Sequence, residues 1–570
     1  MTRDCVLTPE AVDSMIAKGD CIVIFQDYVL RLNSWLGKHP GGRLAILHMV
    51  GRDATDEITA YHMEHTLRTM KAFRVGRKPP GAWTNRTPPI RGGRFDEPAV
   101  PSDPEKRALL GGQLDGHAPP AERASRQQSP ASSSDGSEYA SGRESAPDRA
   151  AAQRAKHSLP PDLGSSSSAG AHVTMNADEW TEWAIRQGQE VDRRQYPSLD
   201  ATVQEAIADK YRALHSRIQE QGLYDCRYME YGKELMRYTA LFVAFLAALR
   251  AGWYLTSAVF LGLFWHQIMF TAHDAGHRAI TKSFVVDTLI GLFIGDFCAG
   301  LSMGWWKSSH NVHHLVTNSP EHDPDVQNVP LFATCPSFFK SLRSSYYDFV
   351  FVWDTAASFL VPYQQYTFYP TMCAARFLLY ALSWSHVLSS KSSGLAGSTA
   401  WWIRPTEIGF MACYWFLYGY VLVWRSLPTW QLRVAFVAVS HMVTMPLHVQ
   451  FTLSHWGMST AELGAAESFA QRQLRTTLDV DCPAWLDFVH GGLQFQAIHH
   501  LFPRVPRHNL RTVQGMVKEF CAETGVPYSI LGFVDGNRQV LGRLSDVGDQ
   551  VKILLNCQKY MSVTGDSGLH

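Results

Sequence analysis

The feature that most constrains this chain is a set of three histidine clusters separated by long apolar stretches. One cluster, Gln496-Ala497-Ile498-His499-His500, lies near the carboxyl end, and the others read HDAGH at 273–277 and HNVHH at 310–314. Residues three or four apart share one face of a helix, so each cluster presents its side chains toward one point. One such face cannot complete a metal site. The three clusters therefore predict that distant segments meet at a shared metal centre.

The number and type of these side chains indicate two metal ions. The clusters contain seven histidines and one glutamine: His273, His277, His310, His313, His314, His499, His500 and Gln496. One zinc ion is satisfied by about four ligands. Imidazoles without thiolates suit iron among several metals, so the spacing leaves the metal's identity open. A zinc protease is disfavoured because no glutamate follows the first histidine of HDAGH. Ordinary surface histidines remain the alternative, which suits a lone residue such as His215 better.

Composition places the clusters in a membrane protein. The 570 residues exceed one usual domain, and the balanced charge gives no argument for a nucleic-acid partner. The chain is polar up to about residue 235, and residues 236–455 hold most of its apolar runs. Residues 1–20 lack the apolar core of a secretory signal, and ten cysteines occur without a C-x-x-C pair. We expect a lipid-embedded chain with a cytosolic amino end and no disulfide framework.

The apolar stretches predict four transmembrane helices, near 236–249, 253–272, 407–423 and 432–453. Two other apolar stretches must not cross if all clusters lie on one side of the membrane. Asp296 interrupts the stretch 289–303, and Pro370 interrupts the aromatic-rich stretch 345–388, so both are predicted to be re-entrant or interfacial. Four crossings leave both termini and the three clusters on the cytosolic side.

The remaining chain divides by composition. Residues 5–78 form a first unit, 79–172 a disordered linker rich in Ser, Pro, Ala, Gly and Arg, and 236–540 the membrane unit, with a tail at 541–570. Residues 173–235 show helical periodicity, which predicts an amphipathic cap on the membrane unit and leaves an interfacial helix as the alternative. The apolar side of that region consists of Val203, Ile207, Tyr211, Leu214 and Ile218.

The first unit carries a His39-Pro40-Gly41-Gly42 motif between β-prone runs and a helical pattern. Pro40 fixes the backbone after His39, and the glycines remove side chains where the chain must pass close to something flat. The unit resembles the cytochrome b5 heme-binding domain. That resemblance implies a small α+β domain in which His39 and His62 are the axial ligands of heme b, with His65, one helical turn further on, as the alternative second ligand. Two axial imidazoles leave an iron that only transfers electrons.

The three clusters, with HGGL before the last one and LFPR after it, resemble the histidine boxes of membrane di-iron desaturases. The fused b5-like unit and the glutamine that opens the third box are typical of the front-end group. The resemblance implies an all-α integral membrane di-iron fold, in which the seven histidines bind two non-heme irons. Gln496 replaces a histidine of other desaturases, either as a ligand or as a hydrogen-bond partner of one.

A further ligand is predicted in the last span. His441, His448 and His455 recur every seven residues, and only His455 lies near the cytosolic end, so we predict it as the eighth histidine. His441 and His448 are interpreted as structural or substrate-lining. Asp323 and Asp325 are expected to cap a helix or to orient a ligand histidine.

Within the front-end group, the chain is most similar to fungal-type sphingolipid delta-8-(E) desaturases. The likeness is carried by 196–200, the run SSHNVHHLVTNSPEHDPDVQNVP and the run VHGGLQFQAIHHLFPRVPRHN. It implies an endoplasmic reticulum enzyme that uses O2, and NADH through cytochrome b5 reductase, to place a trans double bond in a sphingolipid long-chain base. The alternatives are an acyl-lipid desaturase of other regiochemistry, a lipid hydroxylase, and a non-catalytic heme-bearing membrane protein.

Overall fold

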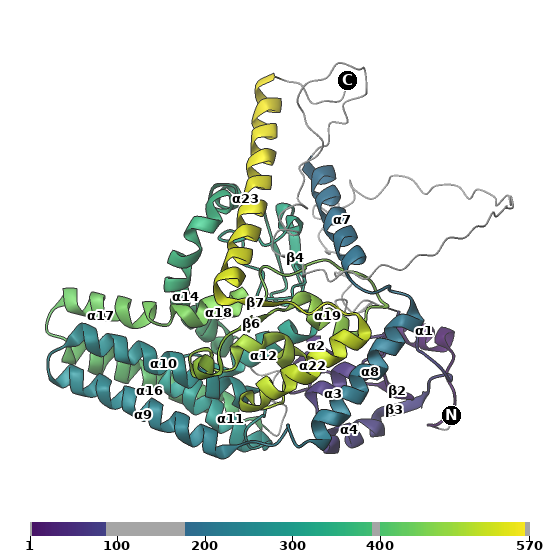
Figure 1. Ribbon diagram of the computed structural model, residues 1–570, viewed down its shortest axis with the longest axis horizontal. Helices are drawn as coiled ribbons and strands as arrows, with labels where there is room; N and C mark the ends of the chain where they lie inside the picture. Colours follow the sequence, from purple (N-terminus) through teal and green to yellow (C-terminus); the bar gives the residue numbers. More distant parts are fainter. Residues whose placement is uncertain (1–2, 87–176, 390–399, 565–570) are drawn as a thin grey trace, which may run out of the picture. The chain divides into compact units, whose positions relative to one another are not determined.

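The structure is a computed structural model that describes residues 3–86, 177–389 and 400–564. The predicted linker, 79–172, lies outside the described residues apart from its first eight positions. The described part is mostly helical, with a three-stranded antiparallel sheet near the amino end and two small two-stranded sheets. Figure 1 shows these elements along the chain.

The amino-terminal unit surrounds its sheet with short helices. Strand β1 pairs with β2, and β2 with β3, all antiparallel. The four residues of β1 are all buried, so the strand has no solvent-facing side. The elements are α1 (Pro9–Ala17), β1 (Ile22–Phe25), β2 (Tyr28–Arg31), α2 (Arg43–Leu47), α3 (Thr55–Tyr61), α4 (Glu64–Met70) and β3 (Arg74–Arg77).

Two amphipathic helices precede the membrane part, as the periodicity predicts. They are α7 (Ala177–Gln195) and α8 (Ala201–Glu220). Ile207, Tyr211, Leu214 and Ile218 of α8 are buried, whereas Val203, assigned to the same face, is 37% exposed. Helix α8 lies against α22 (Leu510–Thr524) and α19 (Phe469–Thr476). The Tyr211 hydroxyl donates to the Leu501 carbonyl at 2.8 Å. Helix α8 thus supports the segment that carries the third histidine cluster.

Among the described residues, three helical segments are long and apolar enough to cross a membrane: Tyr254–Gly276, Ile403–Ser426 and Trp430–Leu453. Helix α10 lies against α9 and α17 (Figure 1). The elements of this part are α9 (Tyr228–Arg250), α10 (Tyr254–Gly276), α11 (Phe284–Leu292), α12 (Met303–Leu315), β4 (Leu342–Ser344), β5 (Phe349–Phe351), α13 (Thr355–Leu360), α14 (Gln364–Leu388), α16 (Ile403–Tyr414), α17 (Trp430–Met442) and α18 (Met445–Leu453). A π-helical segment, Trp415–Ser426, continues α16.

The first predicted span, in α9, is not among these long apolar segments. Helix α9 begins earlier than the apolar stretch, at Tyr228, and its first half carries Glu230, Lys233, Glu234 and Arg237. Only its second half is continuously apolar, so four crossings remain a prediction. The segment 284–315 bends by 116° between Cys298 and Met303, which is compatible with either a broken span or the predicted re-entrant segment.

Pro370 does not end the helix that contains it, while the prediction that 345–388 holds no membrane span agrees with the candidate spans among the described residues, which do not include this segment. Helix α14 runs without a break from Gln364 to Leu388 and contains Pro370. Proline in the second turn removes only the bond to the Tyr366 carbonyl, and Tyr366 is 73% exposed. The helix therefore continues past the proline.

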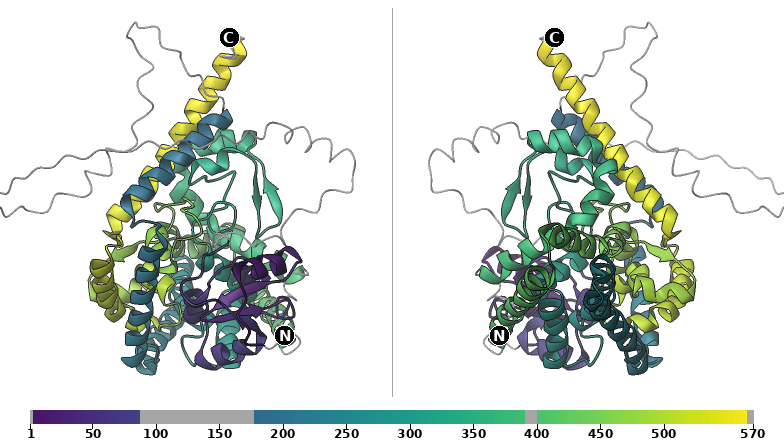
Figure 2. Two further views of the ribbon diagram at one scale, coloured as in Figure 1. Left: turned by 90° about the vertical axis from the view of Figure 1, so that its right-hand side faces the viewer. Right: turned by 90° about the vertical axis from the view of Figure 1, so that its left-hand side faces the viewer.

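The carboxyl-terminal part holds the third cluster and a long final helix. Its elements are α19 (Phe469–Thr476), β6 (Asp479–Asp481), α20 (Asp487–His490), α21 (Gln496–Leu501), α22 (Leu510–Thr524), β7 (Ile530–Gly532) and α23 (Phe533–Thr564). Figure 2 shows α23 as one continuous helix. No element ends near residue 540, where the predicted tail begins, because Leu544, Val547 and Val551 of α23 are buried in a hydrophobic core. That domain boundary remains a prediction without an element end to mark it.

Candidate metal and heme sites

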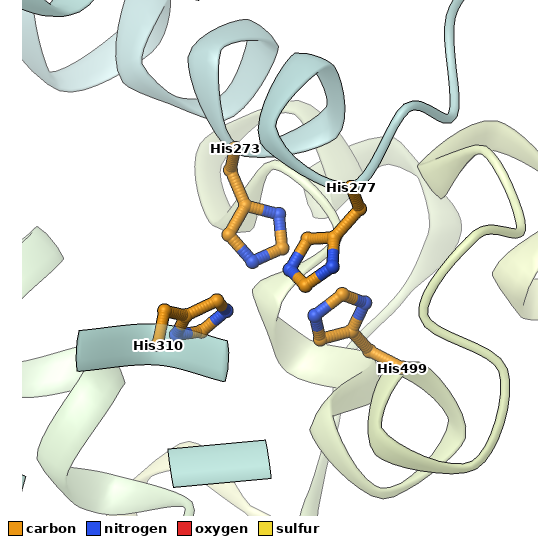
Figure 3. Close-up of side chains that lie close together, drawn as sticks. All are labelled: His273, His277, His310 and His499. Carbon is orange, nitrogen blue, oxygen red and sulfur yellow. The ribbon is translucent and has the colours of Figure 1, made fainter. Parts of the chain in front are cut away.

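The three histidine clusters meet, with imidazoles from four segments of the chain. In one group, the ligand nitrogens of His273, His277, His310 and His499 all lie within 4.8 Å of one another (Figure 3). In a second group, the same holds for His313, His455 and His500. The His314 ring lies 4.4 Å from that of His310 and 4.1 Å from that of His500, so it sits between the groups.

Local structure explains how each segment presents its histidines. His273 lies in the last turn of α10, and His277 follows directly as its carboxyl-terminal cap. Helix α12 begins where the Ser302 hydroxyl accepts from the Trp305 amide at 2.9 Å, and it carries the second cluster. Ahead of α21, Gly491 and Gly492 have φ angles of 58° and 90°, which side-chain-bearing residues rarely adopt. These glycines turn the chain so that the third cluster faces the other two.

The grouping differs from the expectation that each cluster aims at one point. The neighbours His499 and His500 belong to different groups, and so do His310 and His313. Consecutive residues on a helix point about 100° apart, so one short helix serves two points at once. The imidazoles thus fall into two groups, and the two metal ions that the number of ligands predicts stay a prediction; His313 also belongs to a third candidate group, with Asp323 and Asp325.

His455 lies in the second group, where the prediction of an eighth histidine places it. The Nδ1 atom of His455 is buried and has no hydrogen-bond partner among the described residues. His441 and His448 lie elsewhere: the His441 ring stacks on Phe377 at 4.6 Å, and the His448 ring contacts the Thr444 hydroxyl at 3.3 Å. Their structural interpretation agrees with these contacts.

The donor atoms suit metal ions. The Nε2 atoms of His273, His277, His499 and His500 are buried without a hydrogen-bond partner in the part of the chain that the structure describes. Burial and the neighbouring imidazoles hold the pKa of His500 well below its usual range, so its ring is neutral and can donate a lone pair. Inward-facing neutral imidazoles of this kind are suitable ligands for iron.

Hydrogen bonds orient several of these rings. His313 Nδ1 donates to Asp323 Oδ2 at 2.9 Å, and His500 Nδ1 donates to Gln473 Oε1 at 3.0 Å, which leaves Nε2 of each ring for a metal. Asp323 matches its predicted orienting role. Gln473 is a functional residue that sequence reasoning missed, because the polar segment 469–476 resembles a surface helix although all its residues are buried.

Gln496 lies beside the first group. Its side chain is 4% exposed and lines a narrow cavity together with His273 and His499. This position is compatible with both predicted roles, ligand and hydrogen-bond partner of a ligand.

A prediction follows from the Asp323 contact. Replacing Asp323 with asparagine is expected to lower metal affinity and activity by about 10–100-fold, because His313 loses its charged partner. Asp549 is the control, since it lies on α23, pairs with Lys552 and has a side chain that is 59% exposed. Iron content measured after purification should fall in Asp323→Asn and change little in Asp549→Asn. Equal iron content in the two variants would contradict the orienting role.

The amino-terminal unit brings its two predicted heme ligands close together, with their ring planes tilted by 40°. The rings of His39 and His62 have their centroids 5.9 Å apart. His39 Nδ1 donates to the Gly42 carbonyl at 3.0 Å and His62 Nδ1 to the Ile58 carbonyl at 2.9 Å, so Nε2 of each ring is free to bind iron. Burial, with a smaller contribution from His39, lowers the pKa of His62 to about 3 and keeps the ring neutral. His65, the alternative ligand, is exposed.

The two glycines of the HPGG motif have local reasons in the structure. Gly42 has a φ of 86°, which strains other residues, and a Cβ on Gly41 would lie 2.8 Å from His39 Cε1. A larger residue at position 41 would therefore press on the His39 ring, while the predicted close approach to a flat group stays a prediction. The residues present therefore fit a heme held by two imidazoles.

Comparisons with known proteins agree with both sites. Residues 8–78 match the cytochrome b5-like heme/steroid binding domain, and residues 251–532 match the fatty acid desaturase family. The chain is 47% identical to a delta 8-(E)-sphingolipid desaturase of Emericella nidulans, across 99% of this chain and 98% of the relative. It is 41% identical to one of Candida albicans, across 97% and 98%.

A plant relative is more distant. The acyl-lipid (9-3)-desaturase of Borago officinalis is 35% identical, across 63% of this chain and 78% of the relative. Two family matches, full-length relatives and eight converging histidines lead to one conclusion: the chain belongs to the fatty acid desaturases that carry a cytochrome b5-like domain at their amino end.

Proposed function

We propose that this protein is a sphingolipid delta-8-(E) desaturase, which introduces a trans double bond into the long-chain base of a ceramide or related sphingolipid. The observation that carries the proposal is the full-length similarity to proteins of that name, at 40–47% identity. Convergence of all eight histidines, the full predicted ligand set, supports it.

In this proposal the two groups of imidazoles would hold two non-heme irons, and His39 and His62 would hold heme b. Irons bound there would supply the oxidising chemistry, in which O2, two electrons and two protons take two hydrogens from adjacent methylenes and two waters are released. The protein orients the ligands through Asp323 and Gln473 and excludes bulk water by burial. His313, His314 and His500 are at most 2% exposed. NADH, through a cytochrome b5 reductase, is the proposed source of electrons.

The described contacts between the b5-like unit and the rest of the chain support electron delivery within one molecule. Tyr61, next to His62, lies edge-on to the His314 ring at 6.0 Å. Arg212 of α8 binds Asp56 of α3 at 2.6 Å, and Arg52 donates to the Ala465 carbonyl at 3.1 Å. Tethering raises the effective concentration of a donor at its acceptor.

The Arg212–Asp56 pair gives a test of this contact. Arg212→Asp is expected to lower turnover of the full chain by about fivefold, because a partly exposed ion pair contributes about 1 kcal/mol. The double variant Asp56→Arg/Arg212→Asp should recover most of that loss, with heme absorbance as the control for folding. Full activity in the single variant would contradict a role for the pair in docking.

A membrane location in the endoplasmic reticulum, with the histidine centre and both termini in the cytosol, completes the proposal. The support is that His277, His310 and His499 converge from separate segments, which requires one side of the bilayer, and that a cytosolic reductase must reach the heme. Protease protection in sealed microsomes tests it: sites at both ends should be cut in intact vesicles, and protection of either end contradicts the topology.

The direct test of function is expression in a host that lacks delta-8 unsaturation. Mass spectrometry of its lipids should show a long-chain base two hydrogens lighter, with the double bond at carbon 8 in trans geometry. Fatty-acyl products alone would instead indicate an acyl-lipid desaturase, and a hydroxylated base would indicate a hydroxylase.

A further inference from the structure

A pocket of about 340 Å³ lies next to the histidine centre and belongs to neither metal group. The start of α9 forms one wall, and α20 with the segment leading to α21 forms the other. Polar and charged side chains dominate its lining, among them Glu230, Arg237, Gln494 and Arg511. The proposed chemistry at the irons uses none of these side chains.

The pocket adjoins the cavity on the metal side. Gly491, Gly492 and Arg507 line both this pocket and the narrow cavity that His273, Gln496 and His499 also line. Arg507 is 6% exposed and donates to Asp274 Oδ2 at 2.7 Å, next to His273. A molecule held in the pocket therefore lies one layer of residues away from the ligands of the first group.

The charges in the pocket are largely paired with one another. Arg511 Nε donates to Asp487 Oδ2 at 2.9 Å, and Lys233 binds Glu230 at 2.8 Å. Arg507 binds Glu234 as well as Asp274. Arg227 and Arg237 also line the pocket, and their hydrogen bonds go to the His508 carbonyl and the Gln267 amide oxygen rather than to a carboxylate. The pocket thus offers donors and acceptors side by side, which suits a neutral group with hydroxyls and an amide, and an anionic headgroup is the competing ligand.

Arg237 is a half-buried donor whose contacts are not to a carboxylate. Its Nη1 donates to the amide oxygen of Gln267 at 2.9 Å, and its guanidinium lies 4.7 Å from the centroid of the Phe488 ring. Neither partner carries a negative charge. A hydroxyl or carbonyl oxygen entering the pocket can accept from the remaining nitrogens of Arg237 without displacing an ion pair.

Exposed apolar side chains occur on both segments that line the pocket. Trp485 and Phe488 belong to the lining and are 71% and 43% exposed, and on α9 Leu235 and Met236, outside the lining, are 63% and 68% exposed. Exposed aromatic side chains are typical of the membrane–water interface. A two-chain lipid can therefore keep its acyl chain at the bilayer while its polar end enters the pocket and its long-chain base extends toward the metal centre.

We propose that this pocket binds the polar end of the sphingolipid long-chain base, its hydroxyls and amide, and so determines which carbon reaches the metal centre. The inference rests on the proposed function. Carbon 8 lies seven bonds from carbon 1, which is about 8 Å of extended chain at about 1.2 Å per bond. The pocket shares lining residues with the cavity at the metal ligands, so a polar group held there favours a carbon close to the polar end of the chain over a distant one.

The test uses the purified full chain, dihydroceramide and 1-deoxydihydroceramide, which lacks the carbon-1 hydroxyl. Arg237→Met keeps the length of the side chain and removes its donors. It is expected to raise KM for dihydroceramide about tenfold with little change in kcat, and to reduce the wild-type preference for dihydroceramide over its deoxy analogue. Arg538→Met, on the exposed part of α23, is the matched control and should leave both unchanged.

Binding without turnover gives a second readout. Oxidised protein should bind a dihydroceramide labelled on its acyl chain about tenfold more weakly in Arg237→Met than in the wild type, at equal heme and iron content. Unchanged binding and KM, with carbon-8 product still forming, would overturn the pocket's role and leave the proposed function intact. Tighter binding of phosphatidylserine vesicles than of dihydroceramide, lost in Arg237→Met, would also overturn it, because the ligand would then be anionic. If the wild type makes no unsaturated base, the proposed function fails, and the binding assay still decides whether the pocket takes this ligand.

Discussion

Replacing His499 with alanine is expected to lower product formation by at least about 100-fold and to reduce non-heme iron, while the heme spectrum stays unchanged. The His499 ring lies 4.5 Å from that of His273 and 4.6 Å from that of His277, and its Nε2 is buried without a partner among the described residues. Loss of a side chain that only orients a ligand already costs about 10–100-fold. Loss of the ligand itself should cost no less.

The measurement combines lipid analysis of cells that express the variant with iron and heme assays of the purified protein. His65→Ala is the control histidine, since His65 is exposed and lies on α4. A His499→Ala protein with normal product would remove His499 from the metal centre. A variant that loses heme as well as iron would indicate a folding defect, and His499→Gln would then replace it in the comparison.

Replacing His62 with alanine is expected to abolish the absorbance of a heme with two axial imidazoles and to lower turnover by at least about tenfold. The two rings lie 5.9 Å apart, and each is held by a hydrogen bond from Nδ1 to a backbone carbonyl. His65 lies exposed on α4. Non-heme iron should remain, because the His62 side chain is separate from the histidine centre.

His65→Ala is again the control variant, because the sequence offers His65 as the alternative axial ligand of the heme. Optical and electron paramagnetic resonance spectra of His62→Ala and His65→Ala should differ, with only the second resembling the wild type. Retention of the two-imidazole spectrum in His62→Ala would show that another side chain is the axial ligand.

Local periodicity explains why much of the site is predictable. The spacing of His273 and His277, and of His310 and His314, requires only one helical turn. These patterns depend on neighbours in the sequence, so they survive whatever the tertiary fold is. The repeat of His441, His448 and His455 is less local, because α17 ends at Met442 and α18 at Leu453, so His455 lies beyond both helices.

Tertiary contacts explain what sequence reasoning missed. The split of His499 and His500 between two groups depends on how α21 meets the other segments. Helix α19 is polar yet buried, because Arg475 binds Glu467 at 2.7 Å and Gln473 binds His500. Its composition alone predicts a solvated helix.

The fold shows the same division between local and tertiary effects. The apolar face of α8 is confirmed except at Val203, since helical spacing fixes which residues share a side. Pro370 lies inside α14 without ending the helix, because the cost of a proline depends on its place in the helix. The linker 79–172 and the four crossings stay predictions.

The most direct test of the central claim, two non-heme irons beside one heme, is the ratio of total iron to heme in the purified full-length chain. Total iron is measured by mass spectrometry of the digested protein and heme by its pyridine complex. The account predicts three irons per heme in the wild type, and the loss of non-heme iron alone in His499→Ala. One iron per heme in the wild type, all of it porphyrin iron, would contradict the account.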